Sequence, residues 1–236
     1  MRFERSSGIL LHPTSLPAQF GIGDLGEHAY KFVDMLAECR QKLWQICPLG
    51  PTGYGDSPYQ CFSAFAGNPL LIHLESLGEE GLLSQDDLTI HDPFDAYSVD
   101  YGRIIHTKHT LLQKAHQNFR ASANPDQQRD YETFCEQQRD WLEDYALFMA
   151  LKEYHQGAVW NTWEPPLVKR EPETLATWKD RLATQMGYQK FIQHLFFRQW
   201  SALKAYANER DIKIVGDVPI FVAFDSADAW ANPDRF

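Results

Sequence analysis

Short apolar runs and stretches with helical spacing alternate at the amino-terminal end of the chain. Residues 8–11 and 43–48 are apolar, β-prone runs that stop at prolines, and we interpret both as strands that end in loops. Between them, apolar residues recur at helical spacing from Tyr30 to Arg40, which predicts an amphipathic helix. Strand, helix and strand joined by short linkers begin a parallel α/β unit.

The middle of the chain, residues 68–185, breaks this rhythm. We predict an extended segment at its start, three helices and then a linker; these are residues 68–74, helices 111–119, 131–138 and 141–154, and linker segments 163–166 and 169–173. Residues 141–152 are apolar nearly all round, which indicates a buried helix. The simplest account of this region is a largely helical insertion.

The α/β rhythm returns near the carboxyl end. Apolar residues at helical spacing predict a long helix over residues 188–209, and residues 212–216 predict a third strand. We therefore divide the chain into first α/β elements at 1–67, a mostly helical inserted subdomain at 68–185, and a returning helix and strand at 186–236.

Composition narrows the possible partners. The 236 residues are 44% hydrophobic, enough for a real core, and the net charge of −10 comes from scattered acidic residues. This charge argues against nucleic acid and anionic membranes and favours a neutral small molecule or a glycan. The sequence shows no signal peptide and no apolar stretch of membrane-spanning length, so we predict a cytoplasmic protein. The four cysteines match no zinc or redox motif, and we expect reduced, mostly buried thiols.

Polar residues that follow apolar runs are the best site candidates, because ligands bind at the carboxyl ends of parallel strands. Three places qualify: residues 12–15, residues 54–59 and Asp217. The second combines two tyrosines, an aspartate and a serine with glycines and prolines, and this mixture suits a carbohydrate, since aromatic faces stack on sugar rings and polar groups bond hydroxyls. A tight turn whose tyrosines pack on the surface explains the composition equally well.

Asp217 interrupts an apolar strand end, where a carboxylate is costly unless it is hydrogen-bonded or functional. Either a ligand contact or a structural cap satisfied by backbone amides accounts for it. Other patterns are weaker. No nucleophile elbow surrounds Ser15 beside His12, residues 21–26 do not directly follow a strand as a dinucleotide fingerprint does, and the histidines show no metal spacing, so we predict neither metal nor cofactor.

Three long motifs together resemble the amylomaltases, the 4-α-glucanotransferases of glycoside hydrolase family 77. They are LLHPTSLP at 10–17, PLGPTGYGDSPYQ at 48–60 and SAFAGNP at 63–69, and shorter matches at 99–101, 141–148, 196–200 and 216–222 extend the resemblance over essentially the whole chain. The resemblance implies a (β/α)8 TIM barrel whose first three strands are residues 8–11, 43–48 and 212–216, with the helical insertion after the second strand.

The resemblance also implies site residues. Sugar contacts near the donor cleft would come from Tyr54, Ser57, Tyr59 and Asp217. Tyr54 and Tyr101 together resemble the family's second glucan-binding site, and Asp56 is a further candidate because it lies beside these contacts. The implied partners are α-1,4-glucans and maltooligosaccharides.

The family's retaining mechanism uses an aspartate nucleophile and a glutamate acid/base about 5 Å apart. The motifs that carry them in the family, resembling RIDH, AEDLG and HDN, do not occur before Phe236. We therefore expect an amino-terminal part without catalytic residues, whose partner is the remainder of its own barrel. Two alternatives remain open: a non-catalytic glucan-binding module, and a related α-glucan hydrolase, since the choice of acceptor depends on how the cleft excludes water.

Overall fold

The computed structural model describes residues 5–218 and 221–235 and divides the chain into two compact units. The sheet unit comprises Met1–Leu49, Asn68–Ser122 and Leu195–Val218, and the helical unit comprises Gly50–Gly67, Ala123–His194 and Pro219–Phe236. Three parallel strands and many helices confirm the α/β class. The division at residues 67 and 185 stays a prediction.

The sheet contains the three strands that the sequence predicted. Strands β1 (Gly8–Leu10), β2 (Leu43–Gln45) and β3 (Lys213–Val215) pair in parallel in the order β1-β2-β3. The register places Ile9, Trp44 and Ile214 side by side. Each strand is shorter than predicted, since its last apolar residues already belong to the loop that follows.

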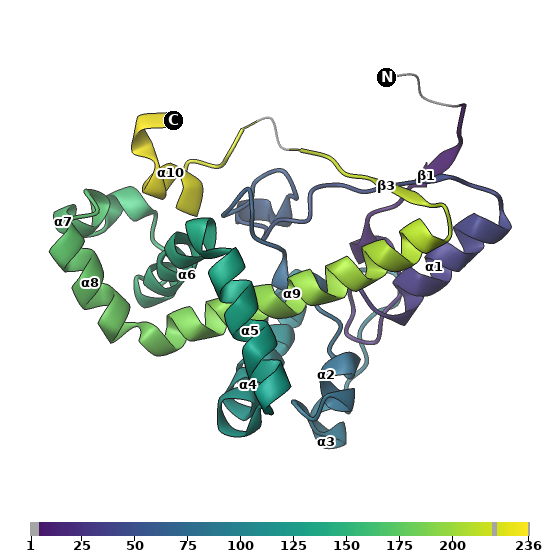
Figure 1. Ribbon diagram of the computed structural model, residues 1–236, viewed down its shortest axis with the longest axis horizontal. Helices are drawn as coiled ribbons and strands as arrows, with labels where there is room; N and C mark the ends of the chain where they lie inside the picture. The colour runs from purple at the N-terminus through teal and green to yellow at the C-terminus, as the bar shows by residue number, and fades with distance from the viewer. Residues whose placement is uncertain (1–4, 219–220, 236) are drawn as a thin grey trace. The chain divides into compact units, whose positions relative to one another are not determined.

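Helix α1 (Glu27–Glu38) and the last part of α9 (Ala183–Glu209) lie side by side in the sheet unit (Figure 1). The Tyr206 hydroxyl of α9 donates to Asp34 of α1 over 2.8 Å. Fully buried Trp44 packs edge-on against Phe32 of α1, with ring centroids 5.1 Å apart. On the sheet's other face, the side chain of Leu10 is 60% exposed.

The sheet unit also contains two 3-10 turns and three further helices, one of which carries a buried lysine. They are the 3-10 turns η1 (Pro13–Ser15) and η3 (Pro69–Leu71) and the helices α2 (Glu75–Glu79), α3 (Gln85–Leu88) and α4 (Tyr101–Ser122). Lys108 of α4 is 1% exposed and donates to the carbonyls of Leu70 (2.7 Å) and Ile72 (2.9 Å). These bonds tie α4 to the η3 turn.

The η3 turn corrects one prediction, because residues 68–74 were expected to be extended. The Asn68 side chain accepts a hydrogen bond from the Leu70 amide over 2.9 Å, and Pro69 fixes the backbone at the first turn position. This local cap closes a 3-10 turn where the apolar composition alone had indicated a strand.

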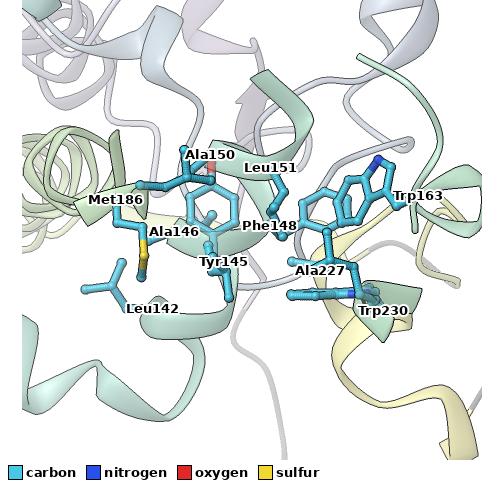
Figure 2. Packing of buried hydrophobic residues seen from close by; sticks show 14 residues of the cluster. Leu142, Tyr145, Ala146, Phe148, Ala150, Leu151, Trp163, Met186, Ala227 and Trp230 are labelled. Atoms are coloured by element: carbon cyan, nitrogen blue, oxygen red, sulfur yellow. Dashed lines mark hydrogen bonds between the residues drawn. The ribbon is translucent and has the colours of Figure 1, made fainter. Parts of the chain in front are cut away.

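The helical unit is built on one long buried helix. Its elements are η2 (Tyr54–Asp56), α5 (Pro125–Gln137), α6 (Arg139–Tyr154), η4 (Trp160–Thr162), α7 (Pro165–Val168), α8 (Pro172–Arg181), the first part of α9, α10 (Ala227–Ala231) and η5 (Pro233–Arg235). Figure 2 shows Phe148 of α6 beside Trp163 and Trp230, at centroid distances of 5.6 and 5.9 Å. The predicted burial of residues 141–152 is confirmed in outline, since residues on all sides of α6 are buried.

The predicted linker is a second correction. Residues 163–166 and 169–173 contribute to α7 and α8, and each helix begins with a proline at its first position, Pro165 and Pro172. Leu167 of α7 is fully buried and its carbonyl accepts from the Trp230 indole over 3.1 Å. Proline was taken as a sign of irregular chain, whereas here it starts two short helices, of which α7 buries Leu167 and α8 buries no residue.

The cysteines were predicted to be reduced and mostly buried, and the structure agrees only with the first part. All four thiols are free, but only Cys61 is buried, while Cys39 is exposed and Cys47 and Cys135 are half-buried. Within the described residues, no helix combines the length and the apolarity needed to cross a membrane.

Removing the Phe148 ring should destabilise the helical unit. Phe148 is fully buried at the centre of the aromatic cluster, so Phe148→Ala should cost about 3–5 kcal/mol of unfolding free energy. The matched control is Phe221→Ala, because Phe221 is 63% exposed and its loss should cost about 0.5 kcal/mol or less. Urea unfolding followed by tryptophan fluorescence measures both, and equal losses would contradict the assigned core.

The cap of α3 should make stability depend on acid pH. The Lys114 ammonium, then the Ser84 hydroxyl and amide, lower the pKa of Asp87 from 3.8 to about 2. A lowered pKa stabilises the folded state above pH 3.8, and this contribution disappears as the pH falls from about 4 to 2. Thermal unfolding between pH 6 and pH 3 should therefore show a smaller acid-induced loss for Asp87→Asn than for the parent chain. Asp86→Asn, in the same turn, should keep the parent's pH dependence.

Candidate functional site

Residues 51–62 form a closed loop at the surface of the helical unit, named here the site loop. Thr52 and Cys61 form an antiparallel bridge across its base. The Gly53 amide donates to the Gln60 carbonyl over 2.9 Å, and the Phe62 amide donates to the Pro51 carbonyl over 3.1 Å. The two ends of the loop are therefore fixed to each other.

The tip of the site loop has an unusual backbone. Gly55 has φ 75° and ψ 13°, which glycine adopts without strain, and Asp56 follows with φ 53°. The Ser57 hydroxyl accepts from the Tyr59 amide over 3.3 Å, and the Gln60 amide donates to the Ser57 carbonyl over 3.1 Å. This turn directs the chain so that Tyr59 is 43% exposed. The Tyr54 side chain lies outside the described part of the structure.

The chain that follows the site loop is anchored to the core of the helical unit. The Phe62 carbonyl accepts from the Ala227 amide, and the Asp228 carboxylate accepts from the Ala64 amide, both over 2.8 Å. The Gln193 side chain of α9 bonds both backbone groups of Gly67, at 2.7 and 2.9 Å. Burial raises the pKa of Asp228. These bonds hold the loop against α9 and α10.

Tyr101 and Asp217 belong to the sheet unit. Tyr101 begins α4, is half-buried and packs against a small cluster that includes Ile22, Leu70 and Ile104. Asp217 follows β3, is exposed, and accepts from the Val218 amide over 2.9 Å. Asp217 therefore does not interrupt a buried strand end. The cost of burying a carboxylate gives no argument for its role, because this carboxylate is exposed.

Of the predicted site residues, Asp56, Ser57 and Tyr59 lie together in the site loop. Tyr101 and Asp217 lie in the other unit, so the shared glucan surface of Tyr54 and Tyr101, and the cleft shared by Asp217 with Tyr59, stay predictions.

A pocket of about 660 Å³ in the sheet unit was not predicted. It lies between the loop that follows β1 and the chain before α4, and its polar lining includes Ser15, Gln19, Asp95 and Ser98. The Tyr97 amide and the Ser98 hydroxyl bind the Asp95 carboxylate over 2.8 and 2.9 Å and lower its pKa. Only one wall of the pocket had a sequence signal, which was the proline-containing loop at the end of a parallel strand. The segment on the opposite wall, before α4, contains no local motif.

His12 and Ser15 are parts of the same turn in this loop. The Ser15 amide donates to the His12 carbonyl over 2.9 Å, and burial lowers the pKa of His12. A lowered pKa keeps the imidazole neutral at pH 7. The arrangement is a structural turn at the pocket wall.

Known proteins match the chain over nearly its whole length. Residues 11–236 match the model of a family described as 4-alpha-glucanotransferase. The chain is 54% identical over 233 residues to the 4-alpha-glucanotransferase of Synechocystis sp. (strain ATCC 27184 / PCC 6803 / Kazusa), covering 99% of this chain and 46% of that protein. It is 50% identical over 236 residues to the 4-alpha-glucanotransferase of Thermus thermophilus, covering 100% of this chain and 46% of that protein.

A solved structure agrees with these relatives. The amylomaltase from Streptococcus agalactiae in complex with acarbose is 42% identical, and superposition gives a TM-score of 0.93 over 99% of this chain and 47% of that chain. The chain thus spans about half the length of the curated relatives it matches. On this sequence and structural similarity, the chain belongs to the 4-alpha-glucanotransferase family, glycoside hydrolase family 77.

Proposed function

We propose that this chain supplies glucan-binding contacts to a 4-α-glucanotransferase, which transfers α-1,4-glucan segments between maltooligosaccharides. The observation that carries the proposal is the site loop, whose backbone is fixed at its base and its tip and which exposes Tyr59. An exposed tyrosine on a rigid loop is suited to stack on a sugar ring at low entropic cost. Acarbose in the related amylomaltase fits this substrate class.

In the proposed enzyme, transfer proceeds through a covalent glycosyl-enzyme intermediate. The two catalytic carboxyls, about 5 Å apart, lie outside residues 1–236, in motifs that this sequence lacks. Asp56, Ser57, Tyr59 and Asp217 then bind sugar hydroxyls and faces, and Tyr54 with Tyr101 forms a second glucan site.

The sheet supports a further part of the proposal, that these strands are the first three of a (β/α)8 barrel. Strands β1 and β3 are its outer strands, and Leu10 and Val215 are 60% and 40% exposed on one face. An open edge and an uncovered apolar face favour association with more strands. The remainder of a barrel would cover both.

A non-catalytic glucan-binding module is the second candidate. The observation that favours it is the exposed Tyr59 on the fixed site loop, because stacking on a sugar ring requires no catalytic carboxylate. Both candidates predict that this chain binds maltooligosaccharides without turnover.

The chain of 236 residues should be inactive on its own. We expect no glucose and no longer oligomers when the purified chain is incubated with maltotriose, because a retaining mechanism needs a nucleophile and an acid/base that the chain lacks. Chromatography of the products measures this, and a complete 4-α-glucanotransferase is the positive control. Turnover that is abolished by a substitution within residues 1–236 would contradict the proposal.

In the complete enzyme, Asp217→Ala should weaken transfer. Loss of a charge-assisted hydrogen bond to a sugar hydroxyl should cost about 1.5–3 kcal/mol of transition-state stabilisation. The kcat/KM for maltotriose should therefore fall roughly tenfold to 150-fold. The control is Asp140→Ala, because the Asp140 side chain is 97% exposed on α6. A folded Asp217→Ala enzyme with the kinetics of the parent would assign Asp217 a purely structural role.

A further inference from the structure

Three potential metal ligands meet in the sheet unit. They are Asp24, in the loop before α1, and His73 and Glu75, at the start of α2, and their ligand atoms all lie within 4.8 Å of one another. The His73 Nε2 and Glu75 Oε2 atoms are 3.1 Å apart. The histidines show no metal spacing in the sequence, because the third member of this group comes from a distant loop.

Asp24 presents a buried oxygen to this group. The residue is 5% exposed, and its Oδ1 atom accepts from the Gly26 amide over 3.0 Å. Among the described residues, its Oδ2 atom has no hydrogen-bond partner, and neither has Glu75 Oε2. The Lys108 ammonium, 3.6 Å from Oδ2, offsets part of the cost of burying this carboxylate, and a bound cation would offset more of it.

His73 is held in place before any ligand binds. The Gln199 side chain bonds both backbone groups of His73, at 2.8 and 3.0 Å. The imidazole lies against Gly26 so closely that an added Cβ there would meet His73 Cδ2 at 2.1 Å. A ligand fixed this way loses little entropy when it coordinates an ion.

Lys108 neutralises the group only in part. Its ammonium is 3.6 Å from Asp24 Oδ2, farther than the 2.7 and 2.9 Å to the Leu70 and Ile72 carbonyls that it bonds. The two carboxylates of Asp24 and Glu75 and the one ammonium of Lys108 together carry one net negative charge. The ammonium also repels any cation that binds to the group, which lowers the affinity for that cation. It does not cancel the whole negative charge of the two carboxylates.

One member of the group, His73, lines a pocket of about 300 Å³. The charged residues on the wall of this pocket are Glu27, Glu79, Glu80 and Arg198. The side chains of His73 and Glu75 are 21% and 30% exposed. Both ligands are therefore partly open to solvent.

We propose that Asp24, His73 and Glu75 form a binding site for one divalent transition-metal ion of the zinc or cobalt class. One imidazole nitrogen and two carboxylate oxygens suit these ions better than calcium or magnesium, which prefer all-oxygen sites. Three protein ligands leave at least one coordination position for water. The site joins the loop before α1 to α2.

The test uses Zn²⁺ alone, added to the metal-free chain. Calorimetry should show one Zn²⁺ bound per chain and an increase in Tm, and His73→Ala and Glu75→Gln should each weaken binding by at least about tenfold. The matched controls are His91→Ala and Glu209→Gln, because both residues are exposed and remote in sequence from the group. They should bind Zn²⁺ like the parent.

The free thiols require a second readout, since Cys39 is exposed and thiolates bind zinc. Co²⁺ should therefore be added to the chain with Cys39→Ser, and its absorption spectrum should show d–d bands without sulfur charge-transfer bands, which His73→Ala abolishes. Absent binding by the parent chain would overturn the proposal. So would binding that His73→Ala and Glu75→Gln leave unchanged, or a spectrum with thiolate bands that depends on cysteine.

Discussion

One buried lysine in each unit holds irregular chain in place. Lys108 bonds the Leu70 and Ile72 carbonyls in the sheet unit. Lys152 bonds the Gly157 carbonyl over 2.7 Å, the Ala158 carbonyl over 3.1 Å and the Asp225 carboxylate over 2.6 Å in the helical unit. Burying an ammonium is costly unless every donor is used, so each lysine requires its loop to present carbonyls inward. In return, the ammonium donates hydrogen bonds to carbonyls that have no partner within a helix or strand.

This constraint explains how short elements remain ordered. The η3 turn has only three residues, and the segment between α6 and η4 has no regular structure, yet both pack against buried side chains. The aromatic cluster around Phe148 completes the helical unit, and the chain that follows the site loop is bonded to the same core through Ala227 and Asp228. The candidate site thus depends on packing far from it in sequence.

Short apolar runs indicated the three strands and helical spacing indicated the long helices, but not their bounds, since α4 already begins at Tyr101, well before the predicted start at residue 111. These patterns also failed where a single local or distant bond decides the structure. The Asn68 cap turned an apolar run into a 3-10 turn, and Pro165 began a helix that composition had assigned to a linker. The roles of Lys108 and Lys152 have no sequence signal, since their partners lie in other elements. The site loop could be identified from its motif, whereas its exposed side chains and the pocket beside Asp95 required three-dimensional contacts.

The strand order has a consequence for how the chain folds during synthesis. Trp44 pairs with Ile9, which precedes it in the chain, and also with Ile214, which is synthesised only after the whole intervening segment. Pairing over long sequence separation is slow, because the closure entropy must be overcome before the contact forms. The first two strands and α1 therefore wait with one edge of β2 open. If the intervening segment folds promptly, it shortens the effective distance between β2 and β3. The folding rate of this segment then determines how long the open edge of β2 is exposed to other nascent chains.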